Sequence, residues 1–487
     1  MKAFLQLLRP EDQLQRIFVV FVLLLLGGGV VALLAQSPLA MLPALAVIGV
    51  AVLAIEWRLI FYLFLLLLAF SREIGILGGL SMDIPSEPLM LLLLGSVAVT
   101  LVLKRDAIPQ HELLHPLLIL LGVGFGWACV STFFSVDTTK SIKFLLAKLW
   151  YIGPFVFGSL LLLWRPAMVW RLTSLYVLGA CITVIYTLIR HATRGFSFED
   201  VNWAIQPFYR NHVIYATVLA LLLPYALYGF KGAGRHLSRW LWGAATAILF
   251  VGLLISYTRA SLLSVPVAGI YYLIVRHRLT RLTLLGVVLL ALGSVLYFVH
   301  NNNYMLYAPD FEKTIFNGEN FEKHLEATYK LEDVSGMERV YRWVAAARMI
   351  DDKPLVGSGP STFYPEYKRY TIRSFHTYVS DNPEHSTTHN YFLLLLAEQG
   401  IPGFVVFALL LGATLLLFES LYHRTSTLPS YRYLVLASGL SFIVIVFHLL
   451  LNELVEVDKI GPLFYFAIAV LIRVQTWVGE GVGKEEA

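Results

Sequence analysis

Charged residues are scarce in this sequence. Asp, Glu, Lys and Arg together make up 14% of its 487 residues, whereas they make up about 25% of an average soluble domain. Hydrophobic residues make up 58%, which is more apolar surface than a soluble fold of this length can bury. A lipid bilayer can cover such surface in place of a protein core. The composition therefore excludes an ordinary soluble protein and predicts a polytopic membrane protein.

Cysteine is also nearly absent, and so are the common metal and nucleotide motifs. Cys129 and Cys181 lie inside apolar segments, where each is expected to be a small buried hydrophobic group. The sequence has no disulfide framework, no Cys/His spacing typical of zinc, no DxD pair and no P-loop. The net charge of +5 is carried mostly by Lys and Arg in short loops. We therefore expect no cofactor, no metal and no nucleic-acid partner.

Apolar runs long enough to cross a bilayer recur along the chain. A spanning helix needs ~20 mostly apolar residues, because ~30 Å of hydrocarbon is crossed at ~1.5 Å per residue. The candidates are 17–35, 38–55, 57–71, 87–103, 115–134, 144–164, 167–189, 212–230, 240–257, 260–276, 281–299, 401–421, 431–452 and 460–478. The second and third are short and closely linked, so they are either a re-entrant pair or two tilted spans. The sequence thus predicts an all-α polytopic membrane protein with 12 to 14 transmembrane helices, 14 being preferred.

The orientation follows from the distribution of Lys and Arg between the short loops. Cations gather at 104–106, 231–239 and 276–281 and in the loop that holds Arg424 and Arg432. The loops near residue 36, at 135–143 and at 453–459 carry fewer. Because cytoplasmic loops are enriched in Lys and Arg, both termini are expected in the cytoplasm. The N-terminal residues are too polar for a cleavable signal peptide, so the first apolar run is expected to remain as a helix.

These features divide the chain into three regions. Residues 1–299 hold about eleven spans, residues 300–388 form a large outer loop, and residues 389–487 hold the last spans. Within the loop, residues 338–351 place apolar residues at helical spacing along one stripe. Pro354 ends this predicted helix, and the glycines that follow permit a tight turn. A loop of this length between spans is unusual unless it has a function.

Several cations fall at the outer ends of apolar runs. Arg259 stands at the junction of two runs, and Arg210 precedes a span that begins with His212. Lys148 lies inside a span near its outer end. Charged side chains at such depth usually line cavities, pair with one another or mark binding sites. Arg259 is therefore either an anion-binding residue in an outward cavity or a snorkelling residue at the membrane interface.

The loop and the helix after it supply further candidates. Arg339 and Arg342 lie away from the apolar stripe of the loop helix, which is typical of a solvated face. His389 and Asn390 stand where the polar loop meets an apolar helix. A neutral histidine is the usual general base near neutral pH, although a helix cap or an interfacial residue is the alternative for His389, and Asn390 could hold a sugar hydroxyl or the imidazole. Glu398, on the same helix, is too far from His389 to orient it unless the helix bends.

An acidic cluster on the outer loop before the last span completes the set of candidates. It consists of Glu453, Glu456 and Asp458. One of these carboxylates is either a partner for one of the arginines or part of an ordinary solvated loop.

An arginine-rich site with a histidine and no metal has a physical rationale. Arginine forks bind phosphate oxygens through paired hydrogen bonds and keep their charge. They can therefore stabilise a leaving lipid-linked diphosphate in place of a divalent metal. A histidine can take the proton from an attacking sugar hydroxyl. Because the donor is already activated, no ATP is needed at the outer face.

Three blocks of the sequence resemble the O-antigen ligase and polymerase superfamily of lipid-linked glycan transferases. Residues 338–363 resemble its central signature, and residues 389–404 resemble its pattern of His-Asn, Glu, Gly-Ile and Gly. Residues 257–261 resemble its Ser-Arg turn, with Thr258 in place of the usual Ser. The N-terminal half is similar only in its run of spans. The residues that match the central signature are Arg339, Trp343, Pro354, Leu355, Gly357, Gly359 and Phe363.

The resemblance implies a GT-C-like helical fold in a bacterial inner membrane, and a metal-independent, inverting transfer. It implies that His389 is the catalytic base and that Arg259 and Arg339 bind the diphosphate of the donor. Arg210 is a further candidate for the diphosphate. The residues expected to support the site are Asn390, His212, Glu453 and Lys148.

The resemblance also implies the substrates. The donor is expected to be an undecaprenyl-diphosphate-linked glycan and the acceptor a lipid A–core sugar, which is the reaction of an O-antigen ligase. A repeat-unit polymerase, which extends a glycan acceptor, and a protein O-oligosaccharyltransferase use the same donor and are the alternatives. A secondary transporter or flippase is the alternative from another class, although the candidate residues gather at the outer face rather than at the midplane.

Overall fold

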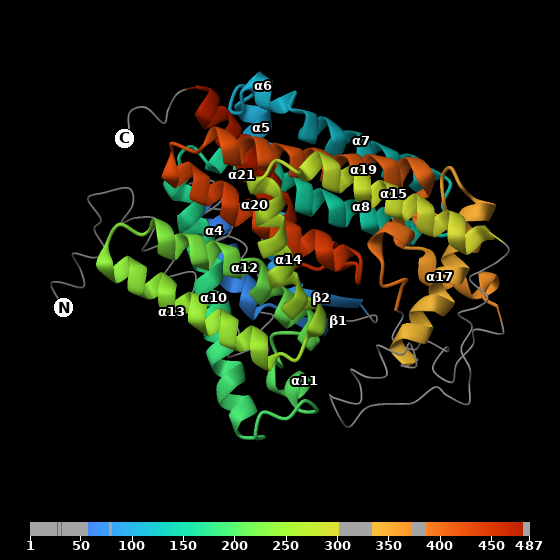
Figure 1. The fold of residues 1–487 in the computed structure, drawn as a ribbon, viewed down its shortest axis with the longest axis horizontal. Helices are drawn as coiled ribbons and strands as arrows, with labels where there is room; N and C mark the ends of the chain where they lie inside the picture. Colours follow the sequence, from blue (N-terminus) through green and yellow to red (C-terminus); the bar gives the residue numbers. More distant parts are fainter. Residues whose placement is uncertain are drawn as a thin grey trace. The chain divides into compact units, whose positions relative to one another are not determined.

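The computed structural model describes residues 57–76, 80–300, 334–372 and 386–480, together with residues 27 and 31 (Figure 1). The chain divides into two compact units, residues 1–63 and 64–487. The described part of the second unit is almost entirely helical.

Ten helices in the described ranges are long and apolar enough to cross a membrane. This confirms the prediction of an all-α polytopic membrane protein. One of the ten is the continuous run Thr138–Leu162, made of α8 (Thr138–Ile152), a π-helical turn (Gly153–Gly158) and α9 (Ser159–Leu162). The others are α5 (Ser86–Leu103), α7 (Pro116–Phe133), α10 (Pro166–Ala192), α12 (His212–Gly232), α13 (His236–Ile255), α15 (Thr280–Val299), α19 (Tyr391–Arg424), α20 (Pro429–Leu449) and α21 (Gly461–Gly479).

The remaining predicted spans have different outcomes. Apart from residues 27 and 31, the runs 17–35 and 38–55 lie outside the described residues. The run 57–71 forms a shorter apolar helix, Arg58–Phe70. The run 260–276 forms α14 (Arg259–Arg276), which has arginine at both ends and is not among the ten. The count of 12 to 14 for the whole chain therefore stays a prediction.

Polar caps set the starts of three long helices. The side chain of Asp137 accepts a hydrogen bond from the backbone N–H of Lys140 at the start of α8. Asn211 caps α12, and Asn390 caps α19 by accepting from the N–H of Leu393. Such caps satisfy otherwise unpaired N–H groups and contribute about 1 kcal/mol each. They explain why α8 and α19 begin before the apolar runs from which the spans were predicted.

Contacts between helix termini define two opposite ends of the helical unit. The Thr258 hydroxyl donates to the carbonyl oxygen of His212 at 3.2 Å, which joins the starts of α14 and α12. Ser261 Oγ lies 3.0 Å from Nε2 of His448, which joins the start of α14 to the last turn of α20. We call this end of the unit the loop end, because helix α17 (Val334–Asp352) also lies there, on the right of Figure 1. The far end is where α12 and α14 finish and α20 begins.

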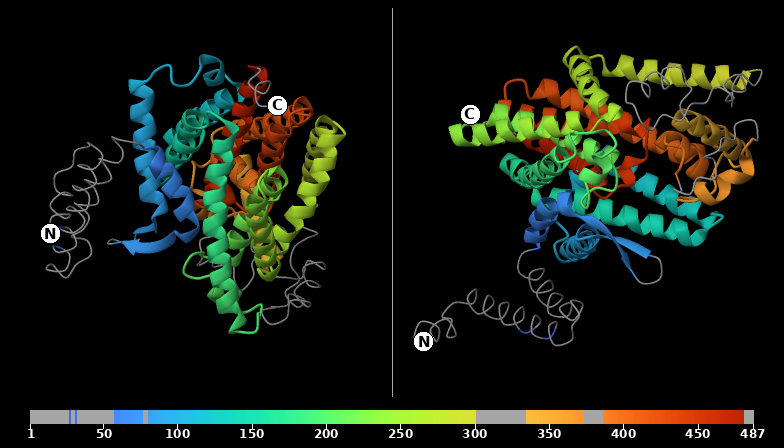
Figure 2. Two further views of the ribbon diagram at one scale, coloured as in Figure 1. Left: turned by 90° about the vertical axis from the view of Figure 1, so that its left-hand side faces the viewer. Right: turned by 90° about the horizontal axis from the view of Figure 1, so that it is seen from below.

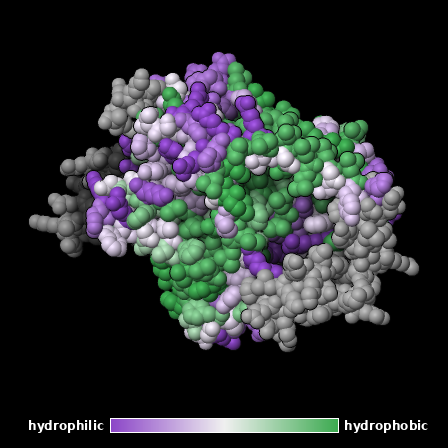
Figure 3. All heavy atoms as spheres, in the orientation of Figure 1, coloured by the Kyte–Doolittle hydropathy of each residue, from purple (hydrophilic) through white to green (hydrophobic). Residues whose placement is uncertain are grey.

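Burial separates central helices from peripheral ones. In α12, α20 and α21, 78% of the apolar stretch is buried, against 17% in α13 and 6% in α15. Figure 2 shows α15, in yellow, at the edge of the bundle. Figure 3, in the orientation of Figure 1, shows hydrophobic residues over much of the visible surface. Hydrophilic residues gather at its upper left. The exposed apolar side chains of α13 and α15 are therefore suited to contact lipid.

A few short elements complete the described fold. Strands β1 (Arg72–Ile76) and β2 (Leu80–Ile84) pair antiparallel, with Arg72 opposite Ile84. The helix predicted at 338–351 is present as α17, which packs on α19. The other short helices are α6 (Gln110–Leu113), α11 (Val201–Ala204) and α18 (Phe363–Tyr367).

Candidate active site

His389 lies at the loop end, immediately before α19, and its backbone has a positive φ of 49°. Its Nδ1 atom is 3.2 Å from Oδ1 of Asn452, which follows α20. The side-chain amide of Asn390 donates to the carbonyl oxygen of Leu450 at 3.3 Å while its oxygen caps α19. The start of α19 and the segment after α20 therefore hold the imidazole together. The cap of α19 is therefore Asn390 and not His389, for which the sequence had left that role open.

Helix α17 fixes the chain that leads into His389. The indole N–H of Trp343 donates to the carbonyl oxygen of Thr388 at 2.7 Å. The guanidinium of Arg342 donates to the carbonyl oxygen of Thr387 at 2.9 Å. Trp343, the tryptophan of the central signature, thus positions the segment that carries the histidine.

The surroundings lower the pKa of His389 from 6.5 to about 4. Burial is the largest cause, and the positive charges of Arg339 and Arg342 add to it, while the hydrogen bond with Asn452 opposes it. The imidazole is therefore neutral at neutral pH, which is the protonation state that a general base needs. When Oδ1 of Asn452 accepts the hydrogen bond, Nδ1 carries the hydrogen and Nε2 keeps its lone pair.

The two arginines of α17 differ in enclosure. The side chain of Arg342 is 8% exposed, and its guanidinium lies 3.5 Å from the carboxylate of Glu338, one turn earlier. The interpretation of this helix face as solvated is therefore wrong for Arg342, because the segment before His389 covers it. Arg339 is half-buried, and its charge acts on His389 together with that of Arg342. Of the two arginines of α17, only Arg339 was assigned to the diphosphate from the sequence, and the position of Arg342 beside the same imidazole was missed.

Arg259 is the first residue of α14 and is half-buried at the loop end. Two residues later, Ser261 contacts His448, and the carbonyl oxygen of His448 accepts the N–H of Asn452 at 2.7 Å. Asn452 in turn contacts His389. A short series of contacts therefore connects the start of α14 with the histidine, and Arg259 and His389 share one end of the bundle.

Arg210 and His212 lie beside other elements of the loop end. Nδ1 of His212 is 3.0 Å from Oδ1 of Asn202 in α11. Arg210 is exposed, and its positive charge acts on the carboxylate of Asp83 in β2. These contacts place the two residues at the α11–α12 junction and next to the hairpin.

Lys148 forms a buried ion pair with Glu456. The ammonium lies 2.5 Å from Oε1 of Glu456, and the two side chains are 11% and 22% exposed. The hydroxyl of Tyr391, two residues after His389, donates to the same oxygen at 2.5 Å. The hydroxyl of Tyr465 lies 3.4 Å from the ammonium. The acidic cluster thus supplies a partner for a cation, but that cation is a lysine of α8 rather than an arginine.

A small cavity adjoins this ion pair. It has a volume of about 70 Å³ and is lined by Lys148, Tyr391 and Tyr465 and by apolar residues of α7, α19 and α21. This space holds a few water molecules and is far too small for a sugar linked to a diphosphate. The cavity therefore belongs to the surroundings of the ion pair rather than to a substrate.

The other two acids of the cluster lie in different surroundings. Burial raises the pKa of Glu453, and the neighbouring Thr387 and Arg342 partly oppose this rise. Asp458 accepts hydrogen bonds from the hydroxyls of Tyr151 at 2.6 Å and Ser86 at 3.1 Å, and burial raises its pKa to about 6. Glu453 is therefore the acid that lies nearest to the α17 side of the site.

Asp458 also belongs to a group of carboxylates. Its oxygens and those of Asp83 and Glu87 come within 4.8 Å of one another, the one such group in the part of the chain that the structure describes. Oxygen ligands of this kind suit Mg²⁺ or Ca²⁺. However, the ammonium of Lys459 lies beside them and donates to the carbonyl oxygen of Ser71 at 2.7 Å. Burial lowers the pKa of Lys459 to about 7, so at neutral pH its amine supplies only part of a positive charge next to the group.

The Gly-x-Gly turn of the central signature contacts residues 389–404, the block that begins with His389, through Glu398. The carboxylate of Glu398 accepts the N–H groups of Ser361 at 2.8 Å and of Phe363 at 2.9 Å. The carbonyl oxygen of Glu398 accepts the N–H of Gly359 at 2.8 Å. Glu398 therefore holds this turn in place, which is a positioning role that the sequence did not identify.

Two glycines allow the blocks to interlock. Gly400 interrupts α19 with a φ of 69° and a ψ of −174°, and a Cβ atom there would lie 2.1 Å from the carbonyl oxygen of Leu355. Gly357 has a φ of 67°, and a Cβ atom there would lie 2.3 Å from the backbone of Glu398. Only glycine combines this conformation with so close an approach. The helix thus bends at Gly400, and the bend brings Glu398 to the turn rather than to His389.

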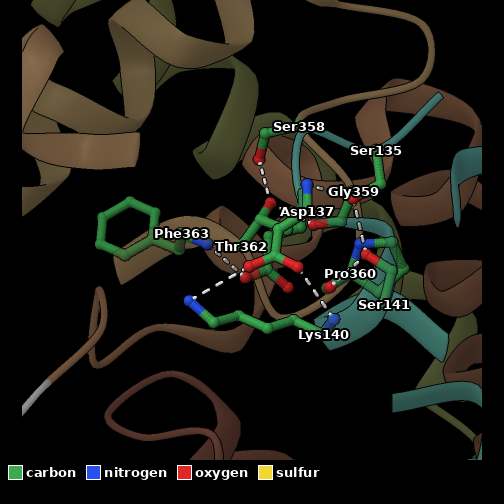
Figure 4. Close-up of polar contacts among 10 residues, drawn as sticks. Ser135, Asp137, Lys140, Ser141, Ser358, Gly359, Pro360, Thr362 and Phe363 are labelled. Carbon is green, nitrogen blue, oxygen red and sulfur yellow. Dashed lines mark hydrogen bonds and ion pairs between the residues drawn. The ribbon is translucent and has the colours of Figure 1, made fainter. Parts of the chain in front are cut away.

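The turn after α7 and the first turn of α8 also contact the Gly-x-Gly turn (Figure 4). The hydroxyl of Ser141 donates to the carbonyl oxygen of Pro360 at 2.7 Å and lies 2.8 Å from the hydroxyl of Ser135. Ser358 and Thr362 face each other across the turn at 2.8 Å. Ser135 and Ser141 stand outside the three sequence blocks, so no sequence signal marked their contacts.

The comparisons with known proteins agree with the three sequence blocks. Residues 244–408 match the family described as O-antigen ligase. The match includes the Arg259 turn, the central signature and the His389 block, so the resemblance inferred from the sequence is confirmed over this region. No curated protein matches the chain. The match supports a glycan transferase of the O-antigen ligase and polymerase type in a multi-pass membrane protein.

Proposed function

We propose that this protein is an O-antigen ligase that moves glycan from an undecaprenyl-diphosphate donor to a lipid A–core sugar. The observation that carries the proposal is the neutral, partly buried His389 beside Arg339 and Arg342, inside the region that matches the family. A base that is neutral at neutral pH, next to fixed positive charge, suits the attack of a sugar hydroxyl on a carbon bonded to a diphosphate.

The proposed reaction is a single displacement. Arg259 and Arg339 bind the oxygens of the diphosphate, with Arg342 adding positive charge. The acceptor hydroxyl gives its proton to Nε2 of His389, and its oxygen forms a bond with the anomeric carbon of the glycan. The bond from that carbon to the diphosphate oxygen breaks at the same time, and the electron pair leaves with the diphosphate. The anomeric configuration is inverted, and no metal takes part.

The arginines also couple donor binding to the strength of the base. In the empty site their charges lower the pKa of His389. A bound diphosphate brings negative charge to the same guanidinium groups and offsets this effect, because nearby opposite charges cancel. The pKa of His389 then rises toward its ordinary value. The histidine accordingly becomes a better proton acceptor when the donor is in place.

The proposed orientation places the loop end at the outer face of a bacterial inner membrane. Lys231, Arg276 and Arg432 lie at the far end, where α12 and α14 finish and α20 begins. Cytoplasmic ends of spans are enriched in such cations, so the far end is the cytoplasmic one in this proposal. The region 300–388 is then periplasmic. Because His389 and its arginines lie at one end rather than at the midplane, transfer chemistry is favoured over transport.

A deletion strain separates ligase from the related reactions. We expect loss of the lipopolysaccharide ladder on a gel and accumulation of lipid-linked polymer, restored by the wild-type chain. Lipopolysaccharide carrying single repeat units would instead identify a polymerase. Intact surface glycans with unglycosylated proteins would identify a protein glycosyltransferase, and both results would overturn the ligase proposal.

A further inference from the structure

A groove runs from the far end of the bundle past its middle, between α12, α14 and α20. Its volume is about 630 Å³, and it reaches from Arg432 and Lys231 near the far ends of their helices to Ala220 in the middle of α12 and Val444 in the second half of α20. Most of its lining is apolar, and no acidic residue lines it within the described part of the chain. Val444 lies twelve residues after Arg432, which corresponds to a length of about 18 Å along the helix.

The cations stand at one end of this groove. The guanidinium of Arg432 lies 4.3 Å from the ring centre of Tyr422, and the ammonium of Lys231 lies 5.1 Å from that of Tyr228. The tyrosine rings therefore hold both cations at the rim. Lys231 is exposed and Arg432 is half-buried, so both remain open to a ligand.

An apolar groove with cations at one end matches the chemistry of a phospholipid with an anionic headgroup. The apolar acyl chain matches the apolar lining. The negative headgroup phosphate, at one end of that chain, matches the cations at one end of the groove. Cationic pockets between spans on the cytoplasmic side are suited to anionic headgroups. The proposed donor binds elsewhere, because its diphosphate faces the loop end, about 30 Å away along a helix of 21 residues.

We propose that this groove binds an anionic glycerophospholipid in the leaflet at the far end, with an acyl chain along the apolar lining and the headgroup phosphate on Lys231 and Arg432. The site is separate from His389 and goes beyond glycan transfer. It gives the enzyme a preference for membranes that contain such lipids.

Native mass spectrometry of the full chain in non-ionic detergent tests this site. Phosphatidylglycerol and phosphatidylethanolamine with identical acyl chains are added in turn, and the bound fraction is measured. We expect tighter binding of phosphatidylglycerol, with a loss of roughly fivefold in affinity for each cation removed in Lys231→Gln and in the double variant with Arg432→Gln. Arg281→Gln, a change to an exposed cation that does not line the groove, should leave binding unchanged.

A second pair of variants tests the acyl chain. Gly269 lines the groove, and a Cβ atom there has open space around it, so Gly269→Leu adds a side chain that takes up groove volume. Gly286 on α15 has equally open surroundings and does not line the groove, which makes Gly286→Leu the matched control. Gly269→Leu should weaken binding of both lipids, and Gly286→Leu should not. Equal binding of the two lipids by the wild type, or binding that the Lys231 and Gly269 variants do not change, would overturn the proposal.

Discussion

Two pairs of cations, one pair at each end of the helical unit, are held in different ways. At the loop end, Arg342 and Lys148 are buried and paired with carboxylates, at 3.5 and 2.5 Å. At the far end, Lys231 and Arg432 lie over tyrosine rings at the rim of a groove without acids among its described lining. A buried, paired cation is fixed in position, which suits a site where a bond must break. A cation at an open rim suits a lipid headgroup that exchanges.

The largest expected effect is on the ion pair of Lys148. Glu456→Gln leaves the buried ammonium without its countercharge, and such a loss costs about 3–5 kcal/mol. We expect a clearly lower thermal unfolding temperature in detergent. The double variant Lys148→Met with Glu456→Gln should recover most of that loss, because no unpaired charge remains. An unfolding temperature of the single variant equal to that of the wild type would mean that the pair does not stabilise the loop end.

The second-largest expected effect is a lower rate of transfer when an arginine of α17 is changed. Arg339→Lys keeps the charge but loses the fork that binds two phosphate oxygens, and we expect transfer to fall about a hundredfold. The control is Arg348→Lys, a change to an exposed arginine on the same helix. Rates of the purified variants on a lipid-linked donor measure the difference. Equal rates for the two variants would remove Arg339 from the diphosphate site.

The interlocked turn predicts a loss of stability at one glycine. In Gly400→Ala the new Cβ would lie 2.1 Å from the carbonyl oxygen of Leu355, at a φ of 69°. Strain of this kind costs about 1–3 kcal/mol, and it should appear as a lower unfolding temperature and lower transfer. Gly286→Ala, on a peripheral helix with open space, should not destabilise the chain. Equal stability of the two variants would show that the bend at Gly400 is not required.

The pH dependence of transfer tests the surroundings of His389. Its pKa is lowered to about 4, so the imidazole stays neutral until the pH falls to that range. The acid limb of kcat/KM, which reports the free enzyme, should therefore lie well below 6.5, the ordinary value. The acid limb of kcat, which reports the enzyme–substrate complex, should lie at a higher pH than that of kcat/KM, because bound diphosphate offsets the arginine charges. Coincident limbs near 6.5 would contradict the proposed coupling.

The smallest expected effect is that of a chelator. The proposed reaction uses arginines in place of a metal, so EDTA should leave the transfer rate unchanged. The carboxylate oxygens of Asp83, Glu87 and Asp458 lie within 4.8 Å of one another and could hold a metal ion. The experiment with EDTA therefore has an outcome that can contradict the proposal. A loss of activity that Mg²⁺ restores would assign a metal to that group.

The sequence predicted the described spans well, because a helix across lipid needs a long apolar run that is visible in one dimension. It did not predict the bend at Gly400, since that bend depends on backbone contacts between blocks that are far apart in the chain. The predicted amphipathic helix at 338–351 was correct, but the sequence could not show that the segment before His389 covers Arg342. An apolar stripe marks the face that packs on α19 and carries no information about a second covering segment.

The candidate site was predictable where a residue type carries its own chemistry. His389 and Arg259 were singled out for that reason and Arg339 through the family resemblance, and all three lie at the loop end. Asn452 and Trp343 act through one hydrogen bond each, to the histidine and to the chain before it. Such partners are defined by the fold alone. Trp343 was visible as part of the family signature, whereas no pattern pointed to Asn452.

The most direct test of the account is transfer by the purified chain with His389→Ala. A lipid-linked glycan donor and a lipid A–core acceptor are incubated with the wild type, with His389→Ala and with His236→Ala, whose histidine is exposed at the far end. The loss of a general base typically costs 10²- to 10⁴-fold in rate, so we predict a loss of roughly that size for His389→Ala and wild-type transfer for His236→Ala. Wild-type transfer by a folded His389→Ala protein would contradict the assignment of His389 as the base.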